Sequence, residues 1–224
     1  MITFRVDVDY AYASRLKSVC RMSLGFPKSQ DYLENACVIA EKINVSSVDV
    51  KAYWFFTVHT LPNQRLLTLL DSGKHVVGLH VVNDADKEIS ILQKVVPWEI
   101  QYYSVHGTES VLGQVLWGRK LGKKQALIHK GFSLKSIHDY PTYPLDALCF
   151  SLDVDKASYQ AVQYAKDCYL SIHPEWLFKS NGKNRGPFYN VLIDLLGVPV
   201  EDKIQHELAC GLDYGYMEDE IHGC

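Results

Sequence analysis

Two aspartates, Asp7 and Asp9, lie two positions apart in the first apolar segment of the chain. Side chains at positions i and i+2 of a β-strand share one face, so these two carboxylates are expected side by side. Neighbouring carboxylates repel each other unless a cation or a proton lies between them. The spacing therefore indicates a divalent metal site. The alternative is a surface strand that ends in an N-capping aspartate.

Histidines end two later apolar segments. His80 closes the segment that begins at residue 75, and His173 stands directly before Pro174, which cannot continue a strand ladder. A neutral imidazole at the end of a buried strand can serve as a metal ligand or a proton carrier. A histidine that is simply hydrogen-bonded in the core is the alternative. We expect both imidazoles at the same edge of a sheet as the aspartates.

The elements that would position these side chains alternate along the chain. Apolar, β-branched segments are followed by segments of helical periodicity, which predicts βα units around a parallel sheet and hence an α/β fold. Seven strands are expected, at residues 2–9, 49–58, 75–82, 99–105, 125–129, 147–152 and 168–173. Helices are expected between them, at residues 29–43, 63–70, 87–94, 110–119 and 156–166.

The pattern changes after His173. Residues 179–187 are polar, and two short helical segments are expected at 189–196 and 201–209. The sequence thus predicts a barrel at residues 1–178 and a C-terminal helical extension at 179–224 that packs on the same domain. A chain of 224 residues is within the range of a single α/β domain.

Composition narrows the class of partner. The net charge of −3 provides no basic surface for a nucleic acid, so a small-molecule or oligosaccharide substrate is expected instead. The first residues enter a strand without a signal-peptide pattern, and no segment is long enough to span a membrane. We therefore expect a cytoplasmic protein. The sequence does not determine the oligomeric state. The six cysteines form no CxxC pair, which favours reduced thiols over a cysteine-ligated metal site.

These motifs in this order resemble the polysaccharide deacetylase family of carbohydrate esterases, which includes nodulation-type chitooligosaccharide deacetylases. The resemblance covers residues 1–178 and marks the chain as a divergent member. The motifs that carry it are Val6-Asp7-Val8-Asp9, the aromatic segment Trp54-Phe55-Phe56, the segment Gly78-Leu79-His80, and Leu170-Ser171-Ile172-His173-Pro174-Glu175-Trp176. It implies a distorted or incomplete (β/α) barrel of about seven parallel strands.

The resemblance also implies roles for the motif residues. In the family, the first motif supplies a catalytic base and a metal ligand, the Gly-x-His strand supplies a ligand histidine, and the last motif supplies the acid. Carried onto this chain, Asp7 is the base, Asp9 and His80 bind the metal, and His173 protonates the leaving amine. The two acids are separated by one residue, so Asp7 and Asp9 can exchange roles.

The third metal ligand has several candidates. The commonest family pattern has a second histidine four residues after the first, where this chain has Asp84. We choose His106, which follows the expected fourth strand, because histidine is the stronger ligand for Zn²⁺ and would complete an Asp-His-His set. Asp84 and Asn83 are the alternatives. The metal is expected to be Zn²⁺, although the same donors suit other divalent first-row ions.

Two further residues are candidates for the pocket. His129 ends the expected fifth strand, and Trp176 follows His173 closely enough to stack on a sugar ring, although packing is the more common role of a tryptophan.

The expected function is metal-dependent N-deacetylation of an acetamido sugar, or of its activated precursor, in surface polysaccharide (O-antigen) biosynthesis. The alternatives are hydrolysis of a different carbon–nitrogen amide bond and an inactive, carbohydrate-binding barrel.

Overall fold

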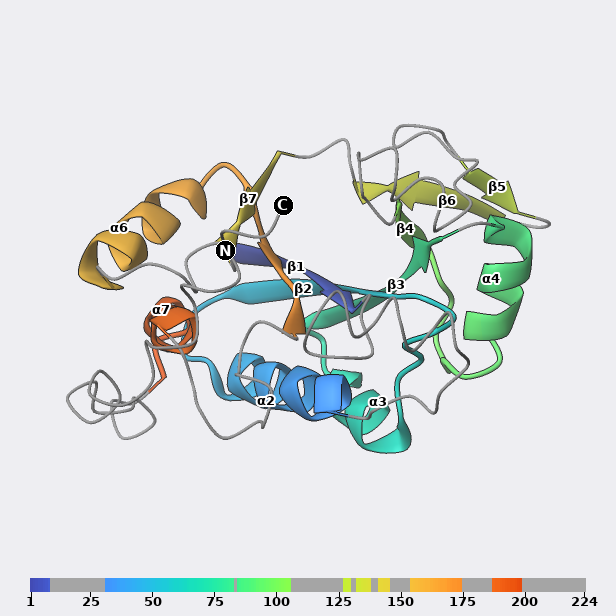
Figure 1. Ribbon diagram of the computed structural model, residues 1–224, viewed down its shortest axis with the longest axis horizontal. Coiled ribbons are helices and arrows are strands. Elements are labelled where there is room, and N and C mark those ends of the chain that lie inside the picture. Colours follow the sequence, from blue (N-terminus) through green and yellow to red (C-terminus); the bar gives the residue numbers. More distant parts are fainter. Residues whose placement is uncertain are drawn as a thin grey trace, which may run out of the picture.

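The computed structural model describes residues 1–8, 31–82, 84–105, 127–129, 132–137, 141–145, 154–174 and 187–198. Within these residues the centre of the protein is one curled sheet of eight strands (Figure 1). The strands are β1 (Ile2–Val8), β2 (Val50–Phe56), β3 (His75–Val81), β4 (Tyr102–Val105), β5 (Leu127–His129), β6 (Phe132–Ser136), β7 (Thr142–Pro144) and β8 (Tyr169–Ile172).

The order of strands in the sheet is β5-β6-β4-β3-β2-β1-β8-β7. All neighbouring strands run parallel except β5, which is antiparallel to β6. The seven parallel strands form a half-barrel, and the described strands do not join β5 to β7. The expectation of a distorted, incomplete α/β barrel is therefore confirmed.

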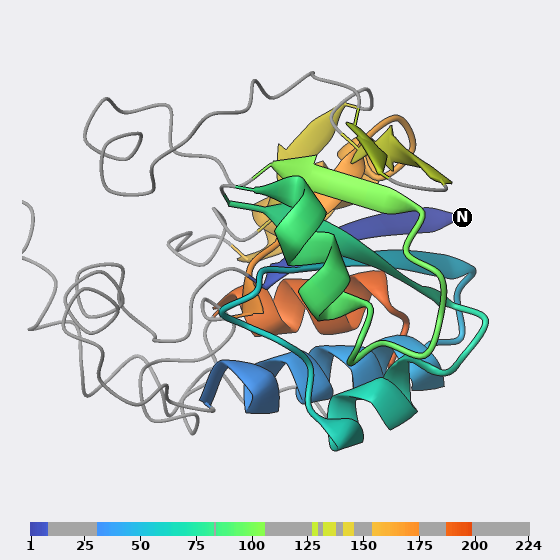
Figure 2. The same cartoon turned by 90° about the vertical axis from the view of Figure 1, so that its right-hand side faces the viewer.

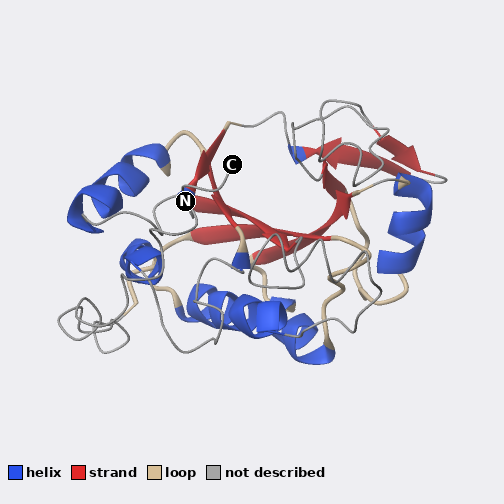
Figure 3. Ribbon diagram, in the orientation of Figure 1, coloured by secondary structure: helices blue, strands red, loops and turns tan. Residues whose placement is uncertain are grey.

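Five described helices surround the outer side of this curl (Figure 3). They are α2 (Asp31–Val45), α3 (Gln64–Leu70), α4 (Ala85–Leu92), α6 (Val154–Tyr164) and α7 (Pro187–Leu195). In the rotated view, the blue, teal and red-orange helices α2, α3 and α7 lie together below the sheet (Figure 2). None of the described helices has both the length and the apolar composition needed to cross a lipid bilayer.

The two faces of the sheet differ in chemistry because side chains alternate along each strand. The outer face is apolar: Val6, Trp54 and Leu79 belong to the hydrophobic core beneath the helices. The inner face includes Arg5 and Asp7 on the first strand, and both are buried. Polar groups from neighbouring strands are thus gathered on the concave side of the half-barrel.

Helix α7 is part of the hydrophobic core. Tyr189, Leu192 and Leu196 are fully buried, and the helix lies between α6 and α2 (Figure 1). The Ser46 hydroxyl donates a hydrogen bond of 2.7 Å to the carbonyl of Leu196, which ties the end of this segment to the chain that enters β2. Residues 187–198 therefore complete the packing under the sheet.

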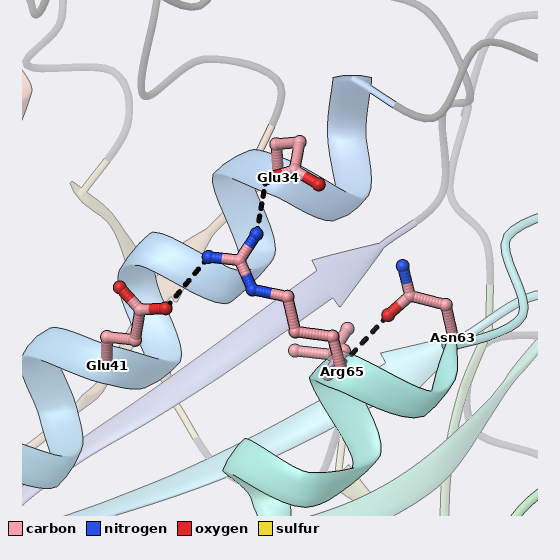
Figure 4. A network of polar contacts seen from close by, with 5 residues as sticks. Glu34, Glu41, Asn63 and Arg65 are labelled. Atoms are coloured by element: carbon pink, nitrogen blue, oxygen red, sulfur yellow. Dashed lines mark hydrogen bonds and ion pairs between the residues drawn. The ribbon is translucent and has the colours of Figure 1, made fainter.

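Helices α2 and α3 are joined by a charged bridge at the surface (Figure 4). The Arg65 guanidinium lies 2.7 Å from a carboxylate oxygen of Glu34 and 3.0 Å from one of Glu41. Helix α3 begins after Asn63, whose side-chain oxygen accepts a 2.9 Å hydrogen bond from the backbone N–H of Leu66. Exposed ion pairs of this kind contribute little to stability, so the buried apolar face of α3 is its main anchor.

Several expected elements differ from the structure. The segment expected at 125–129 is present only as the short strand β5, which is antiparallel rather than parallel. Strands β6 and β7 were not expected. Only two residues separate β5 from β6, a spacing typical of a β-hairpin, whereas the next strand after residue 129 was expected only at 147–152. The strand expected at 147–152 and the helices expected at 110–119 and 201–209 lie outside the described residues.

Candidate functional site

Three of the expected site residues lie where parallel strands end. Asp7 is the last but one residue of β1, His80 the last but one of β3, and His173 follows β8 directly. Val6 and Ile172 are register partners on the neighbouring strands β1 and β8, so Asp7 and His173 each follow a paired residue. The charges of both imidazoles lower the pKa of the Asp7 carboxyl, which places all three groups within electrostatic reach.

Asp7 forms a buried, two-pronged ion pair with Arg5 on the same strand face. Arg5 Nε donates to Asp7 Oδ1 at 3.0 Å, and Arg5 Nη2 lies 2.6 Å from Asp7 Oδ2. Burial raises the pKa of Asp7, but the charges of Arg5, His80 and His173 and the hydrogen bond from Arg5 outweigh it and hold the pKa well below its usual range. Asp7 is therefore a fixed anion at neutral pH.

The Phe55 ring lies beside the Arg5 side chain, and Gly78 leaves space for this ring. The Arg5 guanidinium carbon lies 5.9 Å from the centre of the Phe55 ring, and Phe55 is the register partner of Gly78. A Cβ atom at position 78 would come within 2.6 Å of Phe55 Cε1 and 2.9 Å of the backbone oxygen of Tyr102. The glycine two residues before His80 thus lets the Phe55 ring lie across β3.

His80 is held by a serine from the next strand. His80 and Ser104 are register partners on β3 and β4, and His80 Nδ1 lies 2.5 Å from Ser104 Oγ. His80 is 1% exposed and Ser104 is fully buried. The imidazole ring is therefore fixed in orientation from within the sheet.

The loop after β2 fixes the end of β1. The buried Thr60 hydroxyl donates to the backbone carbonyl of Val8, and Thr57 Oγ1 lies 2.9 Å from Thr60 Oγ1. The backbone N–H of Thr57 also donates to Thr60 Oγ1, at 3.1 Å. This contact holds the backbone directly before Asp9, although Asp9 itself lies outside the described residues.

Asp84, an alternative metal ligand, is the N-cap of helix α4. Its side chain accepts a 3.2 Å hydrogen bond from the backbone N–H of Lys87, lies 3.4 Å from Lys87 Nζ and is 48% exposed. The backbone hydrogen bond from Lys87 is the main cause of a lowered pKa. These contacts account for an acid at position 84 without a metal.

The loop that carries Asp84 is anchored by Glu88. Glu88 is 5% exposed, and its carboxylate accepts from the backbone N–H of Val82 at 2.8 Å and of Asp84 at 3.2 Å. Both donors follow His80 closely in the chain. Glu88 therefore holds the backbone on either side of Asn83, the other alternative metal ligand. Asn83 itself is outside the described residues.

The chain after His173 is anchored in a similar way. Asn35, a buried residue of α2, donates from Nδ2 to the backbone carbonyl of Pro174 at 2.9 Å. His173 itself is partly exposed, in contrast to the buried Asp7. The position next to β8 thus combines a fixed backbone with access to solvent.

His129 does not lie where the sequence analysis expected it. It pairs with Phe132, the first residue of β6, and β6 runs parallel to β4. Because β5 is antiparallel, His129 lies at the amino end of the parallel strands, opposite to the edge where Asp7 and His80 lie. This placement removes the reason for assigning His129 to the pocket.

The metal-ligand set is only partly visible. Asp9, His106 and Trp176 lie outside the described residues, and the residues that are described contain no group of three or more His, Cys, Asp or Glu side chains that could hold a metal ion. His80 fits the part of a nitrogen ligand because its ring is buried and oriented. Both oxygens of Asp7 already contact Arg5, which argues against a ligand role for this residue.

Five residues that support the site were not expected from the sequence: Arg5, Asn35, Thr60, Glu88 and Ser104. Arg5 could have been predicted, because it stands two positions before Asp7 in a strand and must share the same strand face. The sequence indicated Ser104 less clearly, as a polar residue at the end of an otherwise apolar or aromatic strand. Asn35 and Thr60 contact backbone atoms of distant segments, which no local pattern reveals. Glu88 contacts the backbone four and six residues before it.

Comparisons with known protein families, with curated proteins and with solved structures found no match to this chain.

Proposed function

We propose that the chain is a metal-dependent N-deacetylase that acts on an acetamido sugar, or on its activated precursor, in surface polysaccharide biosynthesis. The observation that carries the proposal is the grouping of an ionised carboxylate and two imidazoles at the carboxyl ends of parallel strands of one sheet. Asp7 and His173 lie at the ends of the adjacent strands β1 and β8, and His80 lies near the end of β3, which β2 separates from β1. Active sites of α/β barrels are built at this end of the strands. The resemblance to polysaccharide deacetylases supplies the reaction class.

In this proposal Asp9, His80 and His106 hold a divalent metal, with Zn²⁺ the best match for imidazole and carboxylate donors. When bound, such an ion polarises the substrate carbonyl and lowers the pKa of water. Two observations support this set of ligands. The contact with Ser104 holds the His80 ring in one orientation. The ion pair with Arg5 occupies the oxygens of Asp7, so Asp9 rather than Asp7 is the carboxylate ligand in this proposal.

The proton carriers are Asp7 and His173. Asp7 is ionised at neutral pH and can accept a proton from the attacking water. The ion pair with Arg5 also lowers the proton affinity of Asp7, so in this proposal Asp7 would hold the accepted proton only weakly. His173 is partly exposed and within electrostatic reach of Asp7, and in this proposal it donates a proton to the leaving amine.

The test is release of acetate from nucleotide-linked N-acetylhexosamines and from N-acetylhexosamine oligomers by the Zn²⁺-loaded protein. Asp7→Asn and His173→Ala should each lower kcat by roughly 10²–10⁴-fold without loss of metal. Glu34→Gln is the control, since Glu34 lies on the exposed side of α2 and should leave kcat unchanged.

Two results would contradict the proposal. Release of formate or ring opening of a cyclic imide, without acetate release, would indicate a different amide substrate. A purified protein that neither binds a divalent ion nor gains thermal stability from one would indicate a carbohydrate-binding barrel without turnover.

A further inference from the structure

The contact between His80 and Ser104 occupies one of the two ring nitrogens of His80. Nδ1 lies 2.5 Å from Ser104 Oγ, inside the sheet and between two register partners. Both side chains are buried, so neither can rotate away without leaving a polar group unsatisfied. Any metal that His80 binds must therefore use the other nitrogen, Nε2.

We propose that Ser104 is the positioning residue of His80: its hydroxyl accepts the hydrogen of Nδ1 and makes Nε2 the nitrogen that binds a divalent first-row cation. This inference rests on the proposed function, because it assigns an atom to one of the proposed ligands. A neutral imidazole has one protonated and one unprotonated nitrogen, and the partner of the first selects the second. A serine hydroxyl can take this part because it accepts as well as donates.

The reverse arrangement makes a different prediction. If the Ser104 hydroxyl donated to Nδ1, the hydrogen of the neutral ring would be on Nε2, and His80 could not bind a cation without exchanging tautomers. The two arrangements are therefore distinguished by one property of the protein, the protonated nitrogen of His80. That property can be read without any substrate.

The experiment measures long-range proton–nitrogen correlations of the histidine rings in isotope-labelled, metal-free protein at about pH 8, above the usual pKa of histidine. The His80 signals are those that disappear in His80→Gln. We expect Nδ1 to be protonated and Nε2 unprotonated. In Ser104→Ala the Nε2-protonated form should become populated, whereas Ser104→Thr, which keeps the hydroxyl, should retain the wild-type tautomer.

A second readout is titration of each variant with Zn²⁺ alone. Loss of an orienting partner typically costs 10–100-fold in metal affinity, so Ser104→Ala should bind Zn²⁺ about 10–100-fold more weakly than wild type. Ser104→Thr should recover most of the affinity. Ser171→Ala is the matched control, a buried serine of β8 that pairs with Arg5 rather than His80, and it should change neither the His80 tautomer nor the affinity.

The outcomes separate this inference from the proposed function. Protonation of Nε2 in the wild-type protein would overturn the inference, and so would an unchanged tautomer and affinity in Ser104→Ala. If the wild-type protein binds no Zn²⁺ although Nδ1 is protonated, the proposed function and the ligand role of Nε2 fail, but the orientation of His80 by Ser104 stands. Should Ser104→Ala not fold, the wild-type and Ser104→Thr spectra still decide the question.

Discussion

Replacing Arg5 by methionine tests the buried ion pair at the centre of the candidate site. The side chains of Arg5 and Asp7 are only 10% and 5% exposed, so the substitution leaves a carboxylate without its cation in a nearly dry environment. Removing one partner of a buried pair costs about 3–5 kcal/mol, because the remaining charge stays desolvated. We therefore expect Arg5→Met to lose stability of about this size at neutral pH, measured by urea unfolding.

The pH dependence gives the sign of the effect. In the wild-type protein the folded pKa of Asp7 is lowered below the usual 3.8, so the stability it contributes is complete above that value and is lost as the pH falls towards the folded pKa. In Arg5→Met, burial becomes the dominant influence and raises the pKa of Asp7. The penalty of the substitution should therefore be largest at neutral pH and shrink as the pH is lowered.

The double variant Arg5→Met/Asp7→Asn completes the test. Asparagine carries no charge, so the double variant should be more stable at neutral pH than Arg5→Met alone, although it changes two buried side chains instead of one. The control is Arg65→Met, which removes an exposed arginine that also contacts carboxylates and should change stability little. A loss of less than about 1 kcal/mol in Arg5→Met, or a double variant no more stable than the single one, would refute the reasoning.

Three other predictions concern a glycine, a core histidine and the third metal ligand. Gly78→Ala should cost roughly 1–3 kcal/mol in urea unfolding, since its Cβ would approach Phe55 and a backbone oxygen, whereas Gly73→Ala, with open space around it, should be neutral or slightly stabilising. Burial and two nearby lysines lower the pKa of His75 to about 4, so stability should fall by roughly 3 kcal/mol at most as the pH drops from about 6.5 to 4, and a His75→Asn variant should lack this slope. His106→Ala should reduce bound Zn²⁺ at least about tenfold while Asp84→Ala should not, and the opposite result in metal analysis would exchange their roles.

His75 also illustrates which local patterns were informative. Strand alternation places it on the face opposite to His80, and in the structure its Nδ1 accepts from Trp54 Nε1 at 2.9 Å while its Nε2 lies 3.0 Å from Asn44 Oδ1. The two histidines of β3 therefore have different surroundings for a reason visible in the sequence. Strand alternation alone places the side chains of His75 and His80 on opposite faces of the sheet.

Most of the parallel strands and outer helices could be predicted for the same reason. Strands β1, β2, β3, β4 and β8 and helices α2, α3, α4, α6 and α7 lie within a few residues of their expected ranges. Apolar periodicity indicates which side of each element will face the core, and this pattern lies within each segment of the sequence. The positions of Asp7, His80 and His173 at strand ends follow from these ranges.

Pairing order was decided by the tertiary structure. Nothing local to Ile2–Val8 indicates that β8, more than 160 residues later, lies beside it, yet this pairing brings His173 next to Asp7. The hairpin of β5 and β6 likewise reverses the direction of one strand and carries His129 to the other end of the sheet. Such contacts depend on how the whole sheet closes, which periodicity does not encode.

The contacts that tune the site also depend on the assembled fold. The sequence by itself determined that Asp7 shares a face with Arg5, but only the tertiary structure buried the pair and gave Asp7 a lowered pKa. It was likewise the register of β3 against β4 that set Ser104 against His80. Side-chain type and alternation can be read from each segment of the sequence, whereas desolvation and cross-strand contacts exist only once distant segments are packed together.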